Sequence, residues 1–149
     1  MRLIWNNVVE DGRAFPQVEA LSEEGAAVFF AERTRSAVAV NEATGKVLGL
    51  YILHPNDIGR KAHVANASYA VAADARNKGV GRALVADSLA QVAPCGFRGM
   101  QFNAVVASNA AAVHLYESLG MRRIGTIPGG FLNAAGEYED MHIYYYEAV

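Results

Sequence analysis

The residues best suited to chemistry form a short basic segment with two glycines, residues 76–81, which reads RNKGVG. The first turn of a helix presents unpaired N–H groups and the positive end of the helix dipole, so a segment that opens a helix can bind an anion. Gly79 and Gly81 lack the Cβ atoms that would keep a phosphate group away from this backbone. Arg76 and Lys78 bring positive charge beside it. The segment therefore predicts a phosphate-binding loop.

Two common phosphate-binding signatures do not fit this loop. The pattern G-x-x-x-x-G-K-[ST] occurs nowhere in the chain, and the dinucleotide pattern G-x-G-x-x-G would need a glycine where the chain has Leu84. The pattern that remains is R-x-x-G-x-G. On these six positions alone, a basic loop whose glycines serve only a tight turn is an equally good interpretation, so the surrounding elements have to decide.

The loop lies between two predicted strands and is followed by a predicted helix. Residues 63–71 and residues 100–106 are rich in strand-forming positions. A strand, a helix and a strand within about forty residues form a βαβ unit, so the two strands are predicted to be parallel. The helix is predicted from one stripe of residues at helical spacing: Gly81, Leu84, Val85, Ser88, Leu89 and Val92.

Periodicity and turn residues predict the remaining elements of a single domain over residues 1–149. The fold class is mixed α/β (α+β), with antiparallel strands on both sides of the parallel pair. Asn109 is the predicted N-cap of a helix that ends at the left-handed Gly120. The other predicted elements are helices 2–9 and 22–34, strands 36–40 and 47–53 with a hairpin at 44–46, a polar loop at 54–61, and strands 123–127 and 138–146 joined by a loop at 128–130.

Composition excludes several classes of function. The chain is 52% hydrophobic and 19% charged with a formal net charge of −2, so it has no basic stripe for nucleic acid. Cys95 is the only cysteine, and the four histidines have no metal-ligand spacing, so neither a disulfide nor a metal site is expected. The first residues do not read as a signal peptide and no apolar run is long enough to span a membrane. We expect a cytoplasmic protein.

The R-x-x-G-x-G segment resembles the pyrophosphate loop of the GCN5-related N-acetyltransferase (GNAT) superfamily. The predicted order of elements is similar to the order in that superfamily over nearly the whole chain. A second motif lies where the superfamily has N…LY…LGF: Asn109, then Leu115 and Tyr116, then LGM at 119–121, with Met121 in place of the usual aromatic residue. One departure is that the superfamily fold begins with a strand, whereas this chain is predicted to begin inside the first helix.

The resemblance implies transfer of an acetyl group from acetyl-CoA to a small-molecule amine in one GNAT domain, with no metal. It implies that the parallel strands splay apart and that the pantetheine arm pairs with the backbone of residues 69–73. A backbone N–H near Val71 would polarise the thioester carbonyl. The residues it assigns to the cofactor are Tyr69, Val71, Ala73, Arg76, Asn77, Lys78, Gly79, Val80, Gly81, Arg82 and Asn109.

Tyr116 is the candidate general acid that the resemblance implies. A tyrosine with a pKa of about 10 stays protonated at neutral pH and can give its proton to a leaving thiolate. The structural alternative is a core tyrosine, because Tyr116 lies on the apolar stripe of its helix. No Asp or Glu occurs in either parallel strand, so the sequence offers no general base. His114 lies on the far side of the same helix and is predicted to be solvated.

Asn66 and Asn103 are unusual strand residues, one in each parallel strand. The surrounding segments, residues 63–69 and 101–106, resemble the branch of fungal proline-analogue and phosphinothricin-type N-acetyltransferases. In that branch two strand asparagines hold the carboxylate of the substrate, which implies an amino acid or an analogue here. The structural alternative is that each asparagine satisfies a β-bulge or a neighbouring backbone group.

Two other functions remain open at this point. One is acetylation of a protein N-terminus or of lysine, and the other is a catalytically silent subunit that binds coenzyme A. The sequence does not determine the oligomeric state, for which a homodimer is one candidate.

Overall fold

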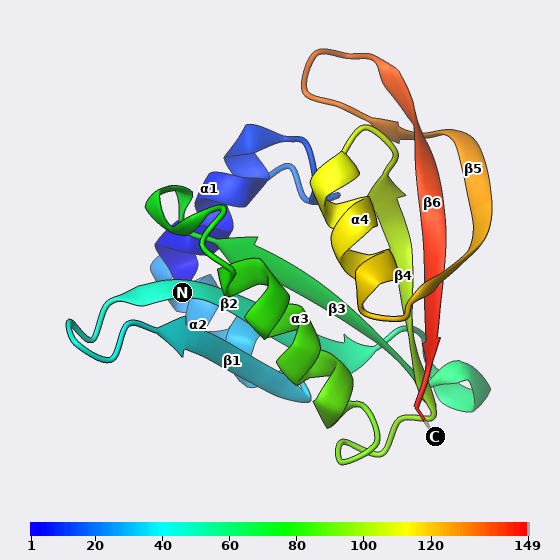
Figure 1. The fold of residues 1–149 in the computed structure, drawn as a ribbon. Helices are drawn as coiled ribbons and strands as arrows, with labels where there is room; N and C mark the ends of the chain where they lie inside the picture. Colours follow the sequence, from blue (N-terminus) through cyan, green and yellow to red (C-terminus); the bar gives the residue numbers. More distant parts are fainter. Residues whose placement is uncertain (149) are drawn as a thin grey trace.

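The computed structural model describes residues 1–148, which form one mixed six-stranded sheet with four α-helices. The strand order across the sheet is β1-β2-β3-β4-β6-β5. Figure 1 shows α3 and α4 in front of the sheet and α1 and α2 behind it. The elements are α1 (Arg2–Asp11), α2 (Glu23–Ala31), β1 (Arg35–Val40), β2 (Val47–Pro55), η1 (Gly59–Lys61), β3 (Val64–Val71), η2 (Ala73–Ala75), α3 (Val80–Gln91), β4 (Gly99–Val106), α4 (Ala110–Ser118), β5 (Arg122–Leu132) and β6 (Tyr138–Glu147), where η marks a 3₁₀ turn.

The parallel pair predicted from the βαβ pattern is β3 and β4, and the two strands splay apart. They pair only where they begin, at Val64 with Gly99 and Ala65 with Met100. Beyond this point β4 bulges against β6, because two residues of β4, Asn103 and Ala104, face a single residue of its partner. A bulge bends its strand, which accounts for the divergence of β4 from β3 (Figure 1).

Each face of the sheet has its own hydrophobic core. Strand β2 is buried on both faces, and its alternating side chains contribute to both cores. On one face Leu50 and Ile52 pack with Trp5 of α1. On the other face Tyr51 packs with residues of α3 such as Val85. The helices thus cover the middle of the sheet on both faces.

Most of the predicted elements are confirmed. The hairpin at 44–46 turns at Gly45 with φ 68°, and Gly120 ends α4 with φ 87°. Asn109 caps α4, because its side-chain oxygen accepts from Ala112 N at 3.2 Å. The first element is a helix, and no strand precedes it in residues 1–148.

The loop predicted at residues 128–130 is wrong. Strand β5 continues through Pro128 to Leu132, and the turn lies at residues 133–137 instead. A register shift between Ile127 and Phe131 places Pro128 in an irregular part of an edge strand, where proline removes no ladder hydrogen bond. The predicted ends of three other segments also move: α1 extends to Asp11, α2 ends at Ala31, and β2 extends into the polar loop as far as Pro55.

Candidate functional site

A cavity of about 350 Å³ occupies the gap where β3 and β4 separate. It is lined from the α3 and α4 side of the sheet by Gly81, Leu115 and Tyr116, and from the opposite side by Phe15 of the α1–α2 loop. Asn66 and Asn103 of the two splayed strands also line it, as do several neighbouring strand residues. The cavity therefore passes through the sheet and connects its two faces.

Strand β3 has a free backbone edge along this cavity. Residues of an antiparallel strand direct their N–H and C=O groups alternately to one side and the other. Val64 O accepts from Asn56 N at 2.8 Å and Ala72 N donates to Leu48 O at 2.8 Å, so the even-numbered residues pair toward β2. The odd-numbered residues beyond the parallel pairing, whose backbone groups face the gap, are Ala67, Tyr69 and Val71. An extended ligand chain can pair with this edge as an added strand.

The free edge ends earlier than the sequence predicts. The resemblance implied that the pantetheine arm pairs with residues 69–73, but β3 stops at Val71, where the predicted strand also ends, and Ala73 begins the 3₁₀ turn η2. Backbone pairing at the edge is therefore available through Tyr69 and Val71, and Ala73 is not part of it.

The N-terminus of α3 opens toward the same cavity. Gly79 is its N-cap with φ 80°, and no side chain caps the helix. The first-turn N–H groups are therefore available to a ligand. Asn77 has φ 61°, a left-handed conformation that is unusual for a residue other than glycine. Arg76 and Lys78 are exposed beside this turn.

Gly81 leaves open space where a side chain would begin. A Cβ at this position would meet only Leu115 and Val71, each at 3.9 Å, which is ordinary contact distance. The protein itself therefore tolerates a methyl group here, and any requirement for glycine comes from what binds. Arg82 is differently engaged, because its guanidinium donates to Ser118 Oγ at 2.9 Å and so ties α3 to α4.

Tyr116 projects from α4 onto the cavity wall, among aromatic rings. Its ring lies 4.7 Å from that of Phe102 and 6.3 Å from that of Tyr69, measured between centroids. Burial raises the pKa of Tyr116 above its ordinary value, so the hydroxyl is protonated at neutral pH. His114 is exposed, as predicted.

The hydroxyl of Tyr116 differs from those of the other tyrosines in this aromatic cluster. Within residues 1–148 the Tyr116 hydroxyl has no hydrogen-bond partner. Because no fully buried polar side-chain atom in these residues lacks a partner, the hydroxyl must be partly exposed, and it is exposed to the cavity that Tyr116 lines. The hydroxyl of a buried tyrosine usually has a hydrogen-bond partner. The neighbouring tyrosines follow that rule: Tyr51 donates to Asp87 at 2.6 Å, Tyr69 bonds Ser88 at 2.7 Å, and Tyr144 donates to Glu117 at 2.8 Å.

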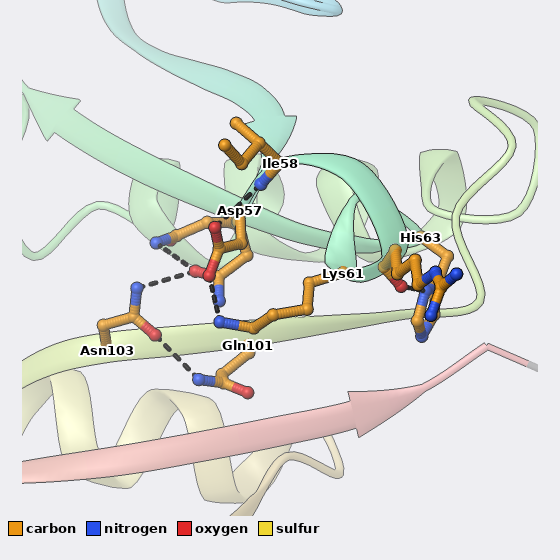
Figure 2. Close-up of polar contacts among 9 residues, drawn as sticks. Asp57, Ile58, Lys61, His63, Gln101 and Asn103 are labelled. Atoms are coloured by element: carbon orange, nitrogen blue, oxygen red, sulfur yellow. Dashed lines mark hydrogen bonds and ion pairs between the residues drawn. The ribbon is translucent and has the colours of Figure 1, made fainter.

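The two strand asparagines meet at one point. Asn66 Nδ2 and Asn103 Nδ2 both donate to Oδ1 of Asn56, at 3.0 Å and 2.6 Å. Gln101 Nε2 in turn donates to Asn103 Oδ1 at 2.8 Å. Figure 2 shows Asn103 pointing from β4 toward the segment after β2, where Asp57 and Lys61 form an ion pair, with Gln101 bonded to the Asn103 amide. Asn103 also lies in the β4 bulge, as the structural alternative for this residue expects.

The cavity wall carries no ordinary acid or base. Its lining side chains, all within residues 1–148, include no carboxylate, imidazole, ammonium or guanidinium group, and its only titratable groups are tyrosines. Among those residues no cluster of His, Cys, Asp and Glu could hold a metal ion. A basic ligand amine that enters here has to lose its proton to water or enter neutral.

Sequence reasoning missed two residues of the site. Asn56 follows Pro55 in a segment that reads only as a polar loop, and its partner Asn66 is brought to it by the register of β2 and β3. Phe15 belongs to the α1–α2 loop and is held by Trp5, whose ring centroid lies 4.4 Å away. No motif marks either position, although the hairpin spacing from β2 to β3 could have suggested Asn56.

A model of a known protein family matches residues 5–121, and its description is the acetyltransferase (GNAT) family. The chain belongs to the GNAT family. N-acetyltransferase aca1 of Schizosaccharomyces pombe is 30% identical to it over 157 residues, covering 95% of this chain and 75% of the relative. The structure of a GCN5-related N-acetyltransferase from Kribbella flavida matches with a TM-score of 0.90 and 39% identity, over 99% of this chain and 90% of that one.

A third GNAT protein shares the fold at lower identity. It is a phosphinothricin acetyltransferase from Sinorhizobium meliloti, solved in complex with AcCoA, with a TM-score of 0.89, 22% identity, and coverage of 98% of this chain and 80% of that one. These matches confirm the family and the GNAT fold that the two sequence motifs indicated. No helix in residues 1–148 of this GNAT chain is long and apolar enough to cross a membrane.

Proposed function

We propose that this GNAT domain transfers an acetyl group from acetyl-CoA to the amine of a small molecule that carries a carboxylate, such as an amino acid or an analogue. The observation that carries the proposal is the convergence of Asn66 Nδ2 and Asn103 Nδ2 on a single oxygen, at the wall of a cavity that passes through the sheet.

The residues around the cavity fit coenzyme A. The uncapped first turn of α3 offers N–H groups to the pyrophosphate, and Gly81 leaves room for it to approach. The free edge at Tyr69 and Val71 offers backbone groups to the pantetheine arm. Asn109 lines the cavity at the start of α4 and is a further candidate for contact with that arm. When bound, acetyl-CoA supplies the thioester whose carbonyl carbon the amine attacks.

The chemistry assigned to the protein is carried by two groups. The backbone N–H of Val71 faces the gap and is suited to stabilise negative charge on a carbonyl oxygen there. The Tyr116 hydroxyl is accessible from the cavity and is protonated at neutral pH, so it is the group placed to protonate a leaving thiolate. Since the wall offers no base, the acceptor amine first loses its ammonium proton to water and attacks in its neutral form. The nitrogen then loses a second proton, which replaces the proton that Tyr116 gives to the thiolate, so that amide and free thiol are the products.

The acceptor class follows from the amide groups. Each NH₂ donates one N–H to Asn56 and retains a second N–H. The second N–H groups of two neighbouring neutral amides suit a carboxylate, and the amides add no charge of their own to the pocket. Phe15 on the opposite wall supplies an apolar surface for the side chain of the acceptor.

The test is release of free thiol from acetyl-CoA with a panel of acceptors. The panel pairs amino acids with their C-terminal amides and adds simple amines, a peptide with a free N-terminus and a peptide with an internal lysine. We expect amino acids to be better acceptors than their amides. The Gly81→Glu variant, which places bulk and negative charge at the pyrophosphate site, is the negative control. Preference for peptides would point to a protein acetyltransferase, and no release above background with any amine would point to a silent binding subunit.

A further inference from the structure

Asn56 stands behind the cavity wall at a junction of hydrogen bonds. It does not line the cavity, but both strand asparagines that do line it donate to its side-chain oxygen. When one N–H of a planar amide donates to a fixed acceptor, the direction of its second N–H is also fixed. The position of Asn56 Oδ1 therefore sets the orientation of Asn66 and Asn103 together.

Asn56 itself is held firmly. Its backbone N–H donates to Val64 O at 2.8 Å, which extends the β2–β3 ladder by one residue beyond Pro55. The next residue, Asp57, is paired with Lys61 and accepts from the N–H of Ile58, so its charge is already balanced (Figure 2). The side-chain oxygen of Asn56 is thus a fixed, uncharged acceptor, and the neighbouring Asp57 carboxylate is paired with Lys61.

The charge at position 56 matters for a carboxylate ligand. If the second N–H groups of Asn66 and Asn103 bind a ligand carboxylate, only these two amide groups separate the carboxylate from Asn56 Oδ1. A neutral carbonyl there leaves the two N–H groups free to attract the anion, whereas a negative charge there would repel it.

We propose that Asn56 is a positioning residue that makes the acceptor pocket selective for carboxylate-bearing amines. It aims the free N–H groups of Asn66 and Asn103 at one point and keeps that point free of negative charge. This inference rests on the proposed function, because it names the residue that sets the acceptor class of the same site.

Two variants separate its two roles. Asn56→Asp keeps an oxygen acceptor for both asparagines and adds a charge, and Asn56→Ala removes the acceptor. The matched control is Asn41→Asp, which adds the same charge at another place. In the wild type the backbone N–H groups of Ala43 and Thr44 donate to Asn41 Oδ1, and the aspartate keeps an oxygen to accept both hydrogen bonds. Asn41 precedes β2 and Asn56 follows it, so the length of the strand, about 3.3 Å per residue, separates the two sites by roughly 30 Å.

The measurement is KM and kcat for an amino acid and for its amide, together with KM for acetyl-CoA, with folding checked by circular dichroism. For Asn56→Asp we expect KM of the amino acid to rise about tenfold or more, while KM of the amide changes little. For Asn56→Ala we expect a rise of about 2- to 12-fold for the amino acid, equivalent to one lost neutral hydrogen bond. In both variants kcat and KM for acetyl-CoA should stay close to wild type.

The outcomes also distinguish this inference from the proposed function. If the wild type does not prefer the amino acid over its amide, the proposed function fails and the inference fails with it. If the wild type shows that preference but folded Asn56→Asp raises KM equally for both acceptors, or for neither, Asn56 does not set selectivity and only the proposed function survives. A selectivity change of equal size in Asn41→Asp would also overturn the inference.

Discussion

Replacing Gly81 by alanine should separate folding from cofactor binding. The added Cβ has room, because its nearest neighbours are Leu115 Cδ2 and Val71 Cγ2 at 3.9 Å. Gly81 lies in the first turn of α3, where alanine restricts the unfolded chain and favours the helix by about 0.5–1 kcal/mol. For a chain of 149 residues this corresponds to a rise in Tm of about 1–4 °C.

The same methyl group should weaken acetyl-CoA binding. It occupies the space through which a pyrophosphate reaches the N–H groups at the start of α3. Loss of one charge-assisted hydrogen bond costs about 1.5–3 kcal/mol, which lowers the affinity about 10- to 150-fold. Isothermal titration calorimetry with acetyl-CoA and thermal unfolding without ligand measure the two effects on the same sample. Stability is expected to rise slightly while affinity falls.

Gly49→Ala is the matched control, with the opposite expectation. A Cβ at Gly49 would lie 2.9 Å from the carbonyl oxygen of Ala70 and 3.0 Å from Leu84 Cδ1, so it overpacks the contact between β2 and α3. We expect a loss of about 1–3 kcal/mol of stability, with little change in affinity for the fraction that is folded. A folded Gly81→Ala protein that binds acetyl-CoA as tightly as wild type would refute the placement of the pyrophosphate at this turn.

Three further predictions test the proposed general acid, the proposed acceptor pocket and a half-buried histidine. Tyr116→Phe should lower kcat about 10²–10⁴-fold and leave acetyl-CoA affinity largely unchanged; normal turnover would assign Tyr116 to the core. Asn66→Ala and Asn103→Ala should each lower kcat/KM for a carboxylate acceptor about 10- to 150-fold, through KM; wild-type acceptor kinetics in both would exclude them from the pocket. Partial burial lowers the pKa of His54 because it disfavours the charged imidazolium. The folded protein therefore keeps its full stability above the unfolded pKa of about 6.5, and it loses stability as pH falls through that value toward the folded pKa. Urea unfolding from pH 8 to pH 5.5 should show this loss, and His54→Gln should show less of it.

Local signals account for the parts of the fold that were predicted correctly. The stripe on α3, the cap at Asn109 and the turn at Gly45 each depend on residues close in sequence, whose preferences act before any tertiary contact forms. The error at residues 128–130 has the reverse cause. Pro128 and the two glycines after it are strong turn signals, but the pairing of β5 with β6 absorbs them as an irregularity in an edge strand.

The sequence by itself determined the chemistry available at the site. The glycines before and in the first turn of α3, and Asn109 with the Leu115-Tyr116 and LGM positions of α4 and its end, are properties of residue type and spacing, and with the order of elements they were sufficient to indicate the GNAT family. Spacing can do this because a helix start or a strand end places its neighbours in a fixed local geometry whatever the rest of the chain does.

Only the tertiary structure decided how those groups meet. The bulge in β4 depends on its pairing with β6, more than thirty residues later in the chain, and this bulge opens the cavity. The pairing register of β2 and β3 brings Asn56 to Asn66, and the splay brings Asn103 to the same oxygen. These contacts join segments distant in sequence, and their geometry depends on the packing of the whole sheet rather than on any local preference.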